Sequence, residues 1–350
     1  MSVSKSVFGS TGDGTVIESY RIENSKKMAI EVITFGAILK NVFVKDANGN
    51  VKDMVMGYDN LEMYLGNGSC FGATVGPIAN RTNAGKFVLD GIEYQIPVND
   101  RGLNNLHTDL DNGFHKRVWA AKVNEADNSV CFSLTKKDGE MGHPGNLSVN
   151  VTYTLTEDNE VKIHYHVDTD KKTVINMTDH SYFNLSGADS DNMEDTVLTI
   201  YASNYTPVRE DAIPTGQIAP VEGTPMDFTK GKAIKTDIEK KDFDQIKICG
   251  GYDHNYAIDG YDGSLRLAAK AVDNKSGRSL EVYTDLPGVQ FYAGNFIGEE
   301  TGKEGFTNKA RMGFCLETQH YPDAVNQPAF PSSVYSIDKP YDSTTIYKFV

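Results

Sequence analysis

Cysteine is scarce in this sequence, and its distribution gives no sign of a metal or redox site. The four cysteines, Cys70, Cys131, Cys249 and Cys315, occur singly, without a C-x-x-C pair and without histidines at zinc-ligand spacing. We therefore expect free thiols, no metal site and no cofactor.

Long apolar runs and long basic runs are also lacking. No window approaches the roughly 18 apolar residues of a membrane span, and the initial MSVSKSVFGSTGDG has no apolar stretch like that of a secretory signal. The 48 acidic residues outnumber 34 basic ones, for a formal charge of -14, and no Lys and Arg run could follow a phosphate backbone. These features predict a cytoplasmic protein that binds neither nucleic acid nor a membrane, and they favour a neutral ligand.

Helical patterns are few, and alternation of apolar and polar residues dominates. LEMYL (61–65) and the stretch 238–243 could each form at most two helical turns. Strand patterns with hairpin signals recur, for example in KFVLDGIEYQI (86–96) and in the pair 147–155 and 160–168, joined by TEDN. Because each strand set has one apolar face that needs cover, we predict an all-β fold, a large antiparallel β-sandwich with a few short helices.

Nothing in the sequence marks a domain boundary. There is no linker rich in Pro, Ser or charge, no low-complexity tract and no fixed-period repeat. We expect one domain over residues 1–350.

Six segments depart from simple alternation by concentrating Asn, His, Arg, Asp, Gln and Glu beside Gly, Pro and aromatic residues. This composition is typical of loops and strand ends that face a sugar. The segments are GPIANRTNAGKF (76–87), NNLHTD (104–109), INMTDHSYFNLSG (175–187), GGYDHNYAI (250–258), TDLPGVQFYAGNF (284–296) and RMGFCLETQHYPDAVNQPAFPSS (311–333).

These segments resemble the signature segments of the aldose 1-epimerase (galactose mutarotase) family. They follow the family's order and spacing over nearly the whole chain, and GFHKRVW (113–119) adds to the match. The resemblance implies the galactose mutarotase-like supersandwich and a cofactor-independent isomerase of carbohydrate metabolism that interconverts the α and β anomers of a hexose.

Anomer interconversion needs a base and an acid that act together. A proton leaves the anomeric hydroxyl while another reaches the ring oxygen, so the ring opens to the aldehyde and can reclose on its other face. A buried carboxylate and an imidazole suit this work near neutral pH, and each contributes about 10²- to 10⁴-fold.

The resemblance makes Glu317 the base and His180 the acid. Glu317 follows the apolar run 312–316, where burial should raise the pKa of its carboxyl. The alternative to a catalytic role for Glu317 is a structural carboxylate that pairs with Arg311. The alternative for His180 is a core histidine that hydrogen-bonds to the backbone. Asp179 stands where the family more often has Asn, but in a strand it would point away from the His180 side.

Further residues match family positions that hold sugar hydroxyls or the developing oxyanion: Asn80, Arg81, His107, Asp253 and Gln290. For Asn80 and Gln290 the alternative is backbone capping. The stretch after His107, TDLDNGF, lacks the family's usual Gly-rich sequence, which leaves the loop shape and the substrate open.

Several further aromatic and histidine positions allow two interpretations each. Phe291 could stack on the sugar or belong to the core. His254 could orient the Asp253 carboxylate or face away from it. His164 and His166 could hold a metal, but they are expected on a solvated strand face because no third metal ligand is evident.

Three functions remain in view. The first is mutarotation of a neutral hexose such as galactose or glucose, or of a reducing disaccharide such as maltose. The second is a hexose-6-phosphate 1-epimerase, which would need an Arg and Lys cluster at the cleft. The third is a sugar-binding module without turnover. The sequence permits a monomer or a homodimer.

Overall fold

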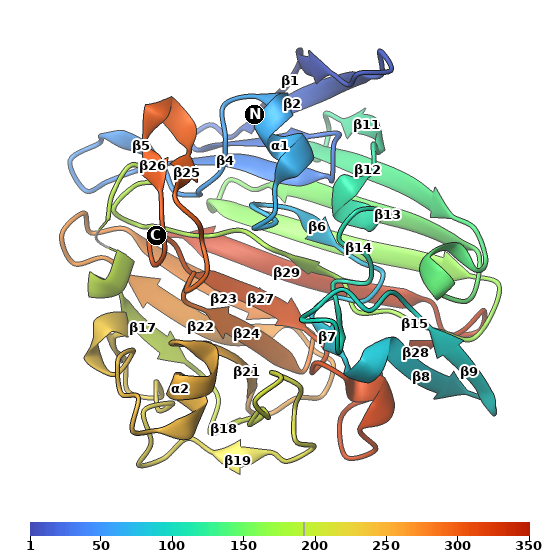
Figure 1. The fold of residues 1–350 in the computed structure, drawn as a ribbon. Coiled ribbons are helices and arrows are strands. Elements are labelled where there is room, and N and C mark those ends of the chain that lie inside the picture. Colours follow the sequence, from blue (N-terminus) through green and yellow to red (C-terminus); the bar gives the residue numbers. More distant parts are fainter. Residues whose placement is uncertain (192) are drawn as a thin grey trace.

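Antiparallel sheets make up most of the fold. We describe it from a computed structural model, which covers residues 1–191 and 193–350. Every ladder between named strands is antiparallel, and the long strands of the largest sheet pass through the centre of the molecule (Figure 1).

The largest sheet has nine strands. In spatial order they are β11 (Ala120–Asn124), β12 (Ser129–Lys136), β13 (Leu147–Leu155), β14 (Glu160–Thr169), β29 (Tyr341–Phe349), β23 (Ser279–Thr284), β22 (Arg266–Val272), β17 (Val197–Ile200) and β20 (Lys232–Ala233). Strand β14 shows why these residues form strands, because its apolar side chains are buried on one face while His164 and His166 on the other are half-exposed.

Two five-stranded sheets complete the main architecture. One has the order β1 (Ser2–Ser10), β2 (Val16–Glu23), β3 (Ala29–Ile33), β4 (Ile38–Lys45) and β5 (Val51–Asp53). The other has the order β19 (Ala219–Pro220), β18 (Asn204–Tyr205), β21 (Asp253–Ala257), β24 (Gly288–Tyr292) and β27 (Cys315–Gln319).

Five two-stranded ladders lie outside these three sheets. They are β10 (Asn105–Leu106) with β7 (Arg81–Thr82), β15 (Thr173–Val174) with β28 (Val334–Tyr335), β16 (Thr178–Asp179) with β6 (Thr74–Val75), β25 (Glu300–Thr301) with β26 (Thr307–Asn308), and β8 (Lys86–Leu89) with β9 (Ile92–Gln95). The β8–β9 hairpin turns at Asp90 and Gly91, as predicted.

The described residues contain two α-helices, α1 (Leu61–Gly66) and α2 (Asp244–Cys249). There are also seven 3₁₀ turns: η1 (Asn83–Gly85), η2 (Phe114–Lys116), η3 (Glu140–Gly142), η4 (Met193–Asp195), η5 (Ile234–Thr236), η6 (Lys303–Gly305) and η7 (Ala324–Asn326). In this described part, neither α-helix has the length or apolar character needed to span a membrane.

The first helix was predicted correctly, and the second begins just after the predicted stretch 238–243. The Asn60 side chain caps α1 by accepting a hydrogen bond from the Met63 N–H. Residues 238–243 themselves form turns and not the predicted helix, and before them Lys232 and Lys240 both bind the Asp237 carboxylate.

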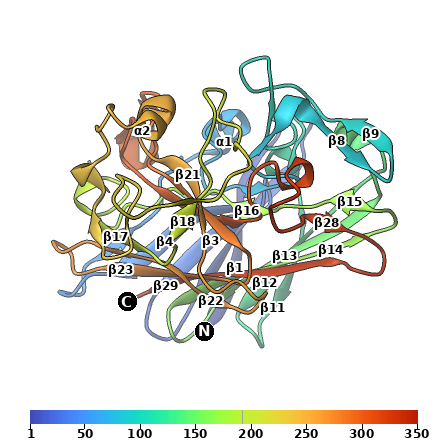
Figure 2. The same ribbon diagram turned by 90° about the horizontal axis from the view of Figure 1, so that it is seen from below.

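One apolar cluster joins the sheets into layers. It contains side chains from β2, β14, β24, β27 and β29. The contact between β27 and β29 includes a hydrogen bond from the Tyr347 hydroxyl to the Leu316 carbonyl at 3.2 Å. In Figure 2 the long strands β13, β14 and β29 lie in the lower half, while α1, α2, β8 and β9 lie in the upper half. The predicted all-β antiparallel sandwich is confirmed.

Candidate active site

The face of the sheet formed by β21, β24 and β27 decides which side chains reach the site. Residues two apart on a strand share a face, and the register aligns Gln290 with Glu317 and Tyr292 with Cys315. Asp253 is aligned with Tyr292 on the other side. These five side chains therefore share one face of the sheet.

A cavity of about 200 Å³ opens over this face. Loops after α1, around β7 and after β10, together with the end of β16, complete its walls. Its lining residues are Gly68, Ser69, Cys70, Asn80, Arg81, Leu106, His107, Leu110, His180, Tyr182, Asp253, Tyr292, Phe296 and Glu317. Six of the eight predicted site residues are among them; Gln290 and Phe291 are not.

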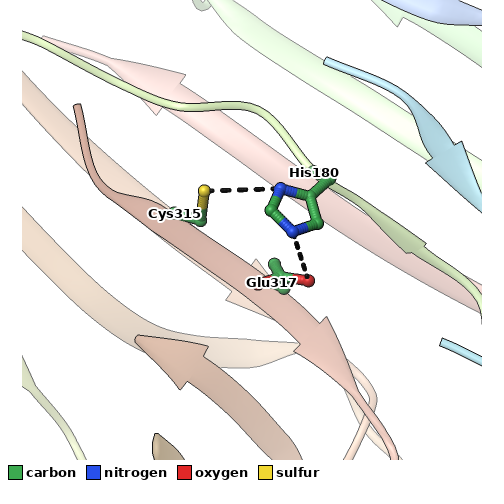
Figure 3. Close-up of side chains that lie close together, drawn as sticks. All are labelled: His180, Cys315 and Glu317. Atoms are coloured by element: carbon green, nitrogen blue, oxygen red, sulfur yellow. Dashed lines mark hydrogen bonds and ion pairs between the residues drawn. The ribbon is translucent and has the colours of Figure 1, made fainter. Parts of the chain in front are cut away.

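Two of the lining residues, His180 and Glu317, face each other (Figure 3). His180 directly follows β16, and Glu317 is the central residue of β27. His180 Nε2 lies 3.6 Å from Glu317 Oε2, and the two side chains are only 7% and 3% exposed. Two groups that are far apart in the sequence thus face each other directly.

Burial shifts the acidity of both groups toward their uncharged forms. The pKa of Glu317 is raised well above its ordinary value, chiefly by burial and further by the nearby Asp253 and Asp179 carboxylates. The pKa of His180 is lowered to about 4, again chiefly by burial. Glu317 Oε2 has no hydrogen-bond partner among the described residues. A carboxyl that easily holds a proton therefore faces an imidazole that easily gives one up.

Asp253 is held in place from two sides. Gln290 Nε2 donates to Asp253 Oδ1 at 2.7 Å, and Arg81 Nη1 lies 3.7 Å from Asp253 Oδ2. Arg81 Nε also donates to Asp100 at 2.8 Å, so the guanidinium bridges two carboxylates. Gln290 thus lies behind Asp253, where it orients the carboxylate without lining the cavity.

Asn80 and His107 form a linked pair among the residues that line the cavity. His107 Nδ1 accepts a hydrogen bond from the Asn80 backbone N–H at 3.1 Å, which places the proton of the neutral ring on Nε2. Burial, followed by the neighbouring His180, lowers the pKa of His107 well below its ordinary value. Asn80 both accepts from the Arg81 N–H and lines the cavity, so the capping alternative and the site assignment both describe it.

Phe291 is placed in the core, the second of the two interpretations considered for it. It is fully buried and packs on Tyr252 and Phe228, because it points to the opposite face of β24 from Gln290 and Tyr292. The aromatic residues that line the cavity are Tyr182, Tyr292 and Phe296. Sequence reasoning missed them, although the alternation from His180 to Tyr182 and from Gln290 to Tyr292 carried the signal.

Two charged residues close to the pair in sequence, Asp179 and Arg311, bind other partners. Asp179 points away from the His180 side and accepts hydrogen bonds from the Ser181 N–H and the Tyr153 hydroxyl. Arg311 binds Glu239 and Glu194, so it does not neutralise Glu317.

Three further histidines lie outside the cavity wall. His254 faces away from the site and contacts Cys249. His164 and His166 are half-exposed on the outer face of β14, where both contact Asp342. This is the solvated face that the sequence predicts.

His180, Cys315 and Glu317 bring a nitrogen, a sulfur and an oxygen within 4.8 Å of one another. The ring directs different nitrogens to its two neighbours, however: Nδ1 lies 3.5 Å from Cys315 Sγ, and Nε2 faces Glu317. The sulfur and the carboxylate thus lie at different nitrogens of the ring, whereas three ligands of one ion would direct their atoms to a common point.

Solved structures with the same architecture identify the fold class. An aldose epimerase homologue from C. elegans superposes with a TM-score of 0.86 at 28% identity, covering 94% of this chain and 98% of its own. A galactose 1-epimerase from Lactobacillus acidophilus superposes with a TM-score of 0.86 at 27% identity, covering 100% of this chain and 98% of its own. The fold is thus galactose mutarotase-like.

The family follows from the sequence comparisons. The model of the aldose 1-epimerase family matches residues 18–348. Bovine galactose mutarotase is 42% identical over 100% of this chain and 99% of its own length, and the aldose 1-epimerase of Escherichia coli is 34% identical over 97% and 96%. The chain belongs to the aldose 1-epimerase family, which confirms the resemblance seen in the sequence. Its activity is that of an isomerase that interconverts sugar anomers.

Proposed function

We propose that Glu317 removes the proton from the anomeric hydroxyl of a neutral hexose while His180 protonates the ring oxygen. The observation that carries this assignment is the 3.6 Å approach of His180 Nε2 and Glu317 Oε2 inside a polar cavity. The C1–O5 bond then breaks to give the open-chain aldehyde. Rotation about the C1–C2 bond and closure with the proton transfers reversed give the other anomer.

The proton count of the pair supports this scheme. His180 and Glu317 together need one exchangeable proton. It is on His180 Nε2 while the sugar ring is closed and on the Glu317 carboxyl while the sugar is open. Burial raises the pKa of Glu317 and lowers the pKa of His180, so the carboxylate readily takes a proton from the anomeric hydroxyl and the imidazolium readily gives one to the ring oxygen. An anomer equilibrium must run in both directions, so the two groups exchange their proton roles when the sugar ring recloses.

The other lining residues are assigned to sugar binding. Asp253, fixed by Gln290 and Arg81, accepts hydrogen bonds from two sugar hydroxyls. Arg81 keeps its charge and acts through orientation. His107 donates from Nε2, because its Nδ1 already accepts from Asn80. Tyr292 replaces Phe291 as the aromatic surface for the ring.

A neutral sugar fits this cavity better than a phosphorylated one. Among the described residues, those that line it include no lysine and a single arginine, Arg81, which is already engaged by Asp100 and Asp253. A phosphate would meet no unshared positive charge there. Galactose, glucose and reducing disaccharides such as maltose remain the candidate substrates. We also assign the chain to the cytoplasm, as one domain that works as a monomer or homodimer.

Polarimetry of freshly dissolved sugars tests the assignment. Wild-type protein should speed the mutarotation of α-glucose, α-galactose or β-maltose and should leave glucose 6-phosphate near its spontaneous rate. His180→Asn should lose about 10²- to 10⁴-fold in kcat together with one limb of the pH profile. His166→Asn, on the outer face of β14, is the matched control and should behave as wild type. An unchanged pH profile in His180→Asn would remove the acid role.

A further inference from the structure

One strand supplies the neighbours of both ring nitrogens of His180. Cys315 Sγ lies 3.5 Å from Nδ1, and Glu317, two residues further along β27, faces Nε2. The Cys315 side chain is fully buried. Figure 3 shows the imidazole ring between the sulfur and the carboxylate.

We propose that Cys315 is a positioning residue for the reaction: its sulfur accepts a hydrogen bond from His180 Nδ1–H, which keeps Nε2 as the nitrogen that exchanges protons with the sugar. This inference rests on the acid role proposed for His180. An imidazolium that gives its Nε2 proton to the ring oxygen becomes a neutral ring that still carries the Nδ1 proton. The tautomer with Nδ1–H is therefore the one the cycle needs, and a partner at Nδ1 selects it.

The stacking contacts of the ring cannot make this selection. Tyr182 stacks on His180 with ring centroids 5.0 Å apart and an interplanar angle of 29°. A flip of the imidazole by 180° would keep this stacking but would exchange nitrogen and carbon positions. The polar contacts at the ring edge distinguish the two orientations. At Nδ1 the side-chain contact is Cys315, and a hydrogen bond with the backbone of His180 itself adds to the polar contacts of the ring.

A thiol suits this position better than a carboxylate would. A carboxylate at Nδ1 would stabilise the imidazolium and weaken it as an acid toward the poorly basic ring oxygen. Burial raises the pKa of Cys315 well above its ordinary value, so the sulfur stays uncharged and leaves the pKa of His180 low. The other titratable groups around the ring are Glu317, Asp253, His107, His115, Tyr182 and Tyr292.

A second pair in the molecule shows the same donor direction. His254 Nδ1 accepts from the Asp253 backbone N–H at 3.2 Å, so the proton of its neutral ring is on Nε2. That nitrogen lies 3.6 Å from Cys249 Sγ, which places a buried N–H against a thiol sulfur. This pair faces away from the cavity and offers a matched control.

The experiment combines kinetics with ¹⁵N NMR of histidine-labelled protein. His180 should carry its proton on Nδ1 in the wild type. Cys315→Ala should shift the proton toward Nε2 and lower kcat by about 10- to 100-fold with little change in KM, because the acid loses its alignment. Cys315→Ser keeps an acceptor and should recover most of the Nδ1 proton and part of kcat. Cys249→Ala should change only the signals of His254.

Two results would overturn the proposal: an Nε2–H tautomer of His180 in the wild type, or a Cys315→Ala protein with wild-type kcat. Thermal melts show whether each variant is folded, and the nearly isosteric serine variant keeps the test open if alanine does not fold. If His180→Asn stayed active while the His180 tautomer in the otherwise unchanged protein depended on Cys315, the acid role of His180 would be refuted. The hydrogen bond between His180 and Cys315 would still be supported.

Discussion

Replacing the Glu317 carboxyl by an amide separates its chemical role from its structural one. Glutamine has nearly the same shape, so Glu317→Gln leaves the packing of β27 intact. Glu317 is 2% exposed, and its Oε2 has no hydrogen-bond partner among the described residues. Arg311 does not stabilise the charged form, because it binds Glu239 and Glu194 instead.

The structure predicts opposite effects on rate and stability. Loss of the base should lower kcat by about 10²- to 10⁴-fold, equivalent to a barrier about 3–5 kcal/mol higher at 1.36 kcal/mol per factor of ten. Stability should not fall. Burial raises the pKa of Glu317 well above its ordinary value, so ionisation in the folded state is unfavourable and its cost grows as the pH rises. The amide has no such cost, and Glu317→Gln should be at least as stable as wild type above neutral pH.

Polarimetry on the preferred sugar and urea denaturation at pH 8 measure the two effects. Glu281→Gln is the control, since Glu281 is a partly buried strand carboxylate that pairs with Lys270 on the nine-stranded sheet. It should keep wild-type kcat. Glu317→Gln with kcat within tenfold of wild type would refute the base role, and a clear loss of stability would refute the view that burial of this carboxyl is unfavourable.

The remaining predictions concern Phe291, Tyr292, Arg81 and Asp179. Phe291→Ala should cost about 3–5 kcal/mol in urea denaturation and leave KM unchanged, whereas Tyr292→Ala should raise KM; a reversed pattern would return Phe291 to the site. Arg81→Lys loses the fork that joins Asp253 to a second carboxylate, and polarimetry should show KM raised about 10- to 100-fold; an unchanged KM would exclude Arg81 from sugar orientation. Burial raises the pKa of Asp179 from 3.8 to about 7, so the folded state holds this proton more tightly than the unfolded chain does. Its contribution to stability therefore falls as the pH rises from about 4 to 7, and Asp179→Asn should gain about 3 kcal/mol relative to wild type across this range. Urea denaturation at pH 4.5 and pH 8 checks this, and a constant difference between the two proteins would contradict it.

Strand patterns predicted the sheets because apolar and polar residues alternate along a strand that buries only one of its faces. In β14 the buried Val161, Ile163, Tyr165 and Val167 alternate with polar residues. The same rule predicts that Phe291 and Gln290 cannot both face the site, yet both were candidate site residues: Gln290 through the family resemblance, and Phe291 as one of two interpretations. Which face of β24 meets the cavity depends on the register with β27, and a single strand does not encode the register.

The loop after His107 shows where local sequence stops being informative. Thr108 adopts a φ of 64°, a left-handed conformation that suits glycine and strains a β-branched residue. Its hydroxyl donates to the Ile78 carbonyl at 3.0 Å and accepts from the Ile78 N–H at 2.8 Å. These two buried bonds tie the loop to a segment 30 residues away and offset the strain. A chain without the usual glycine can thus still place His107 in the cavity wall, because tertiary hydrogen bonds hold a backbone conformation that the local sequence disfavours.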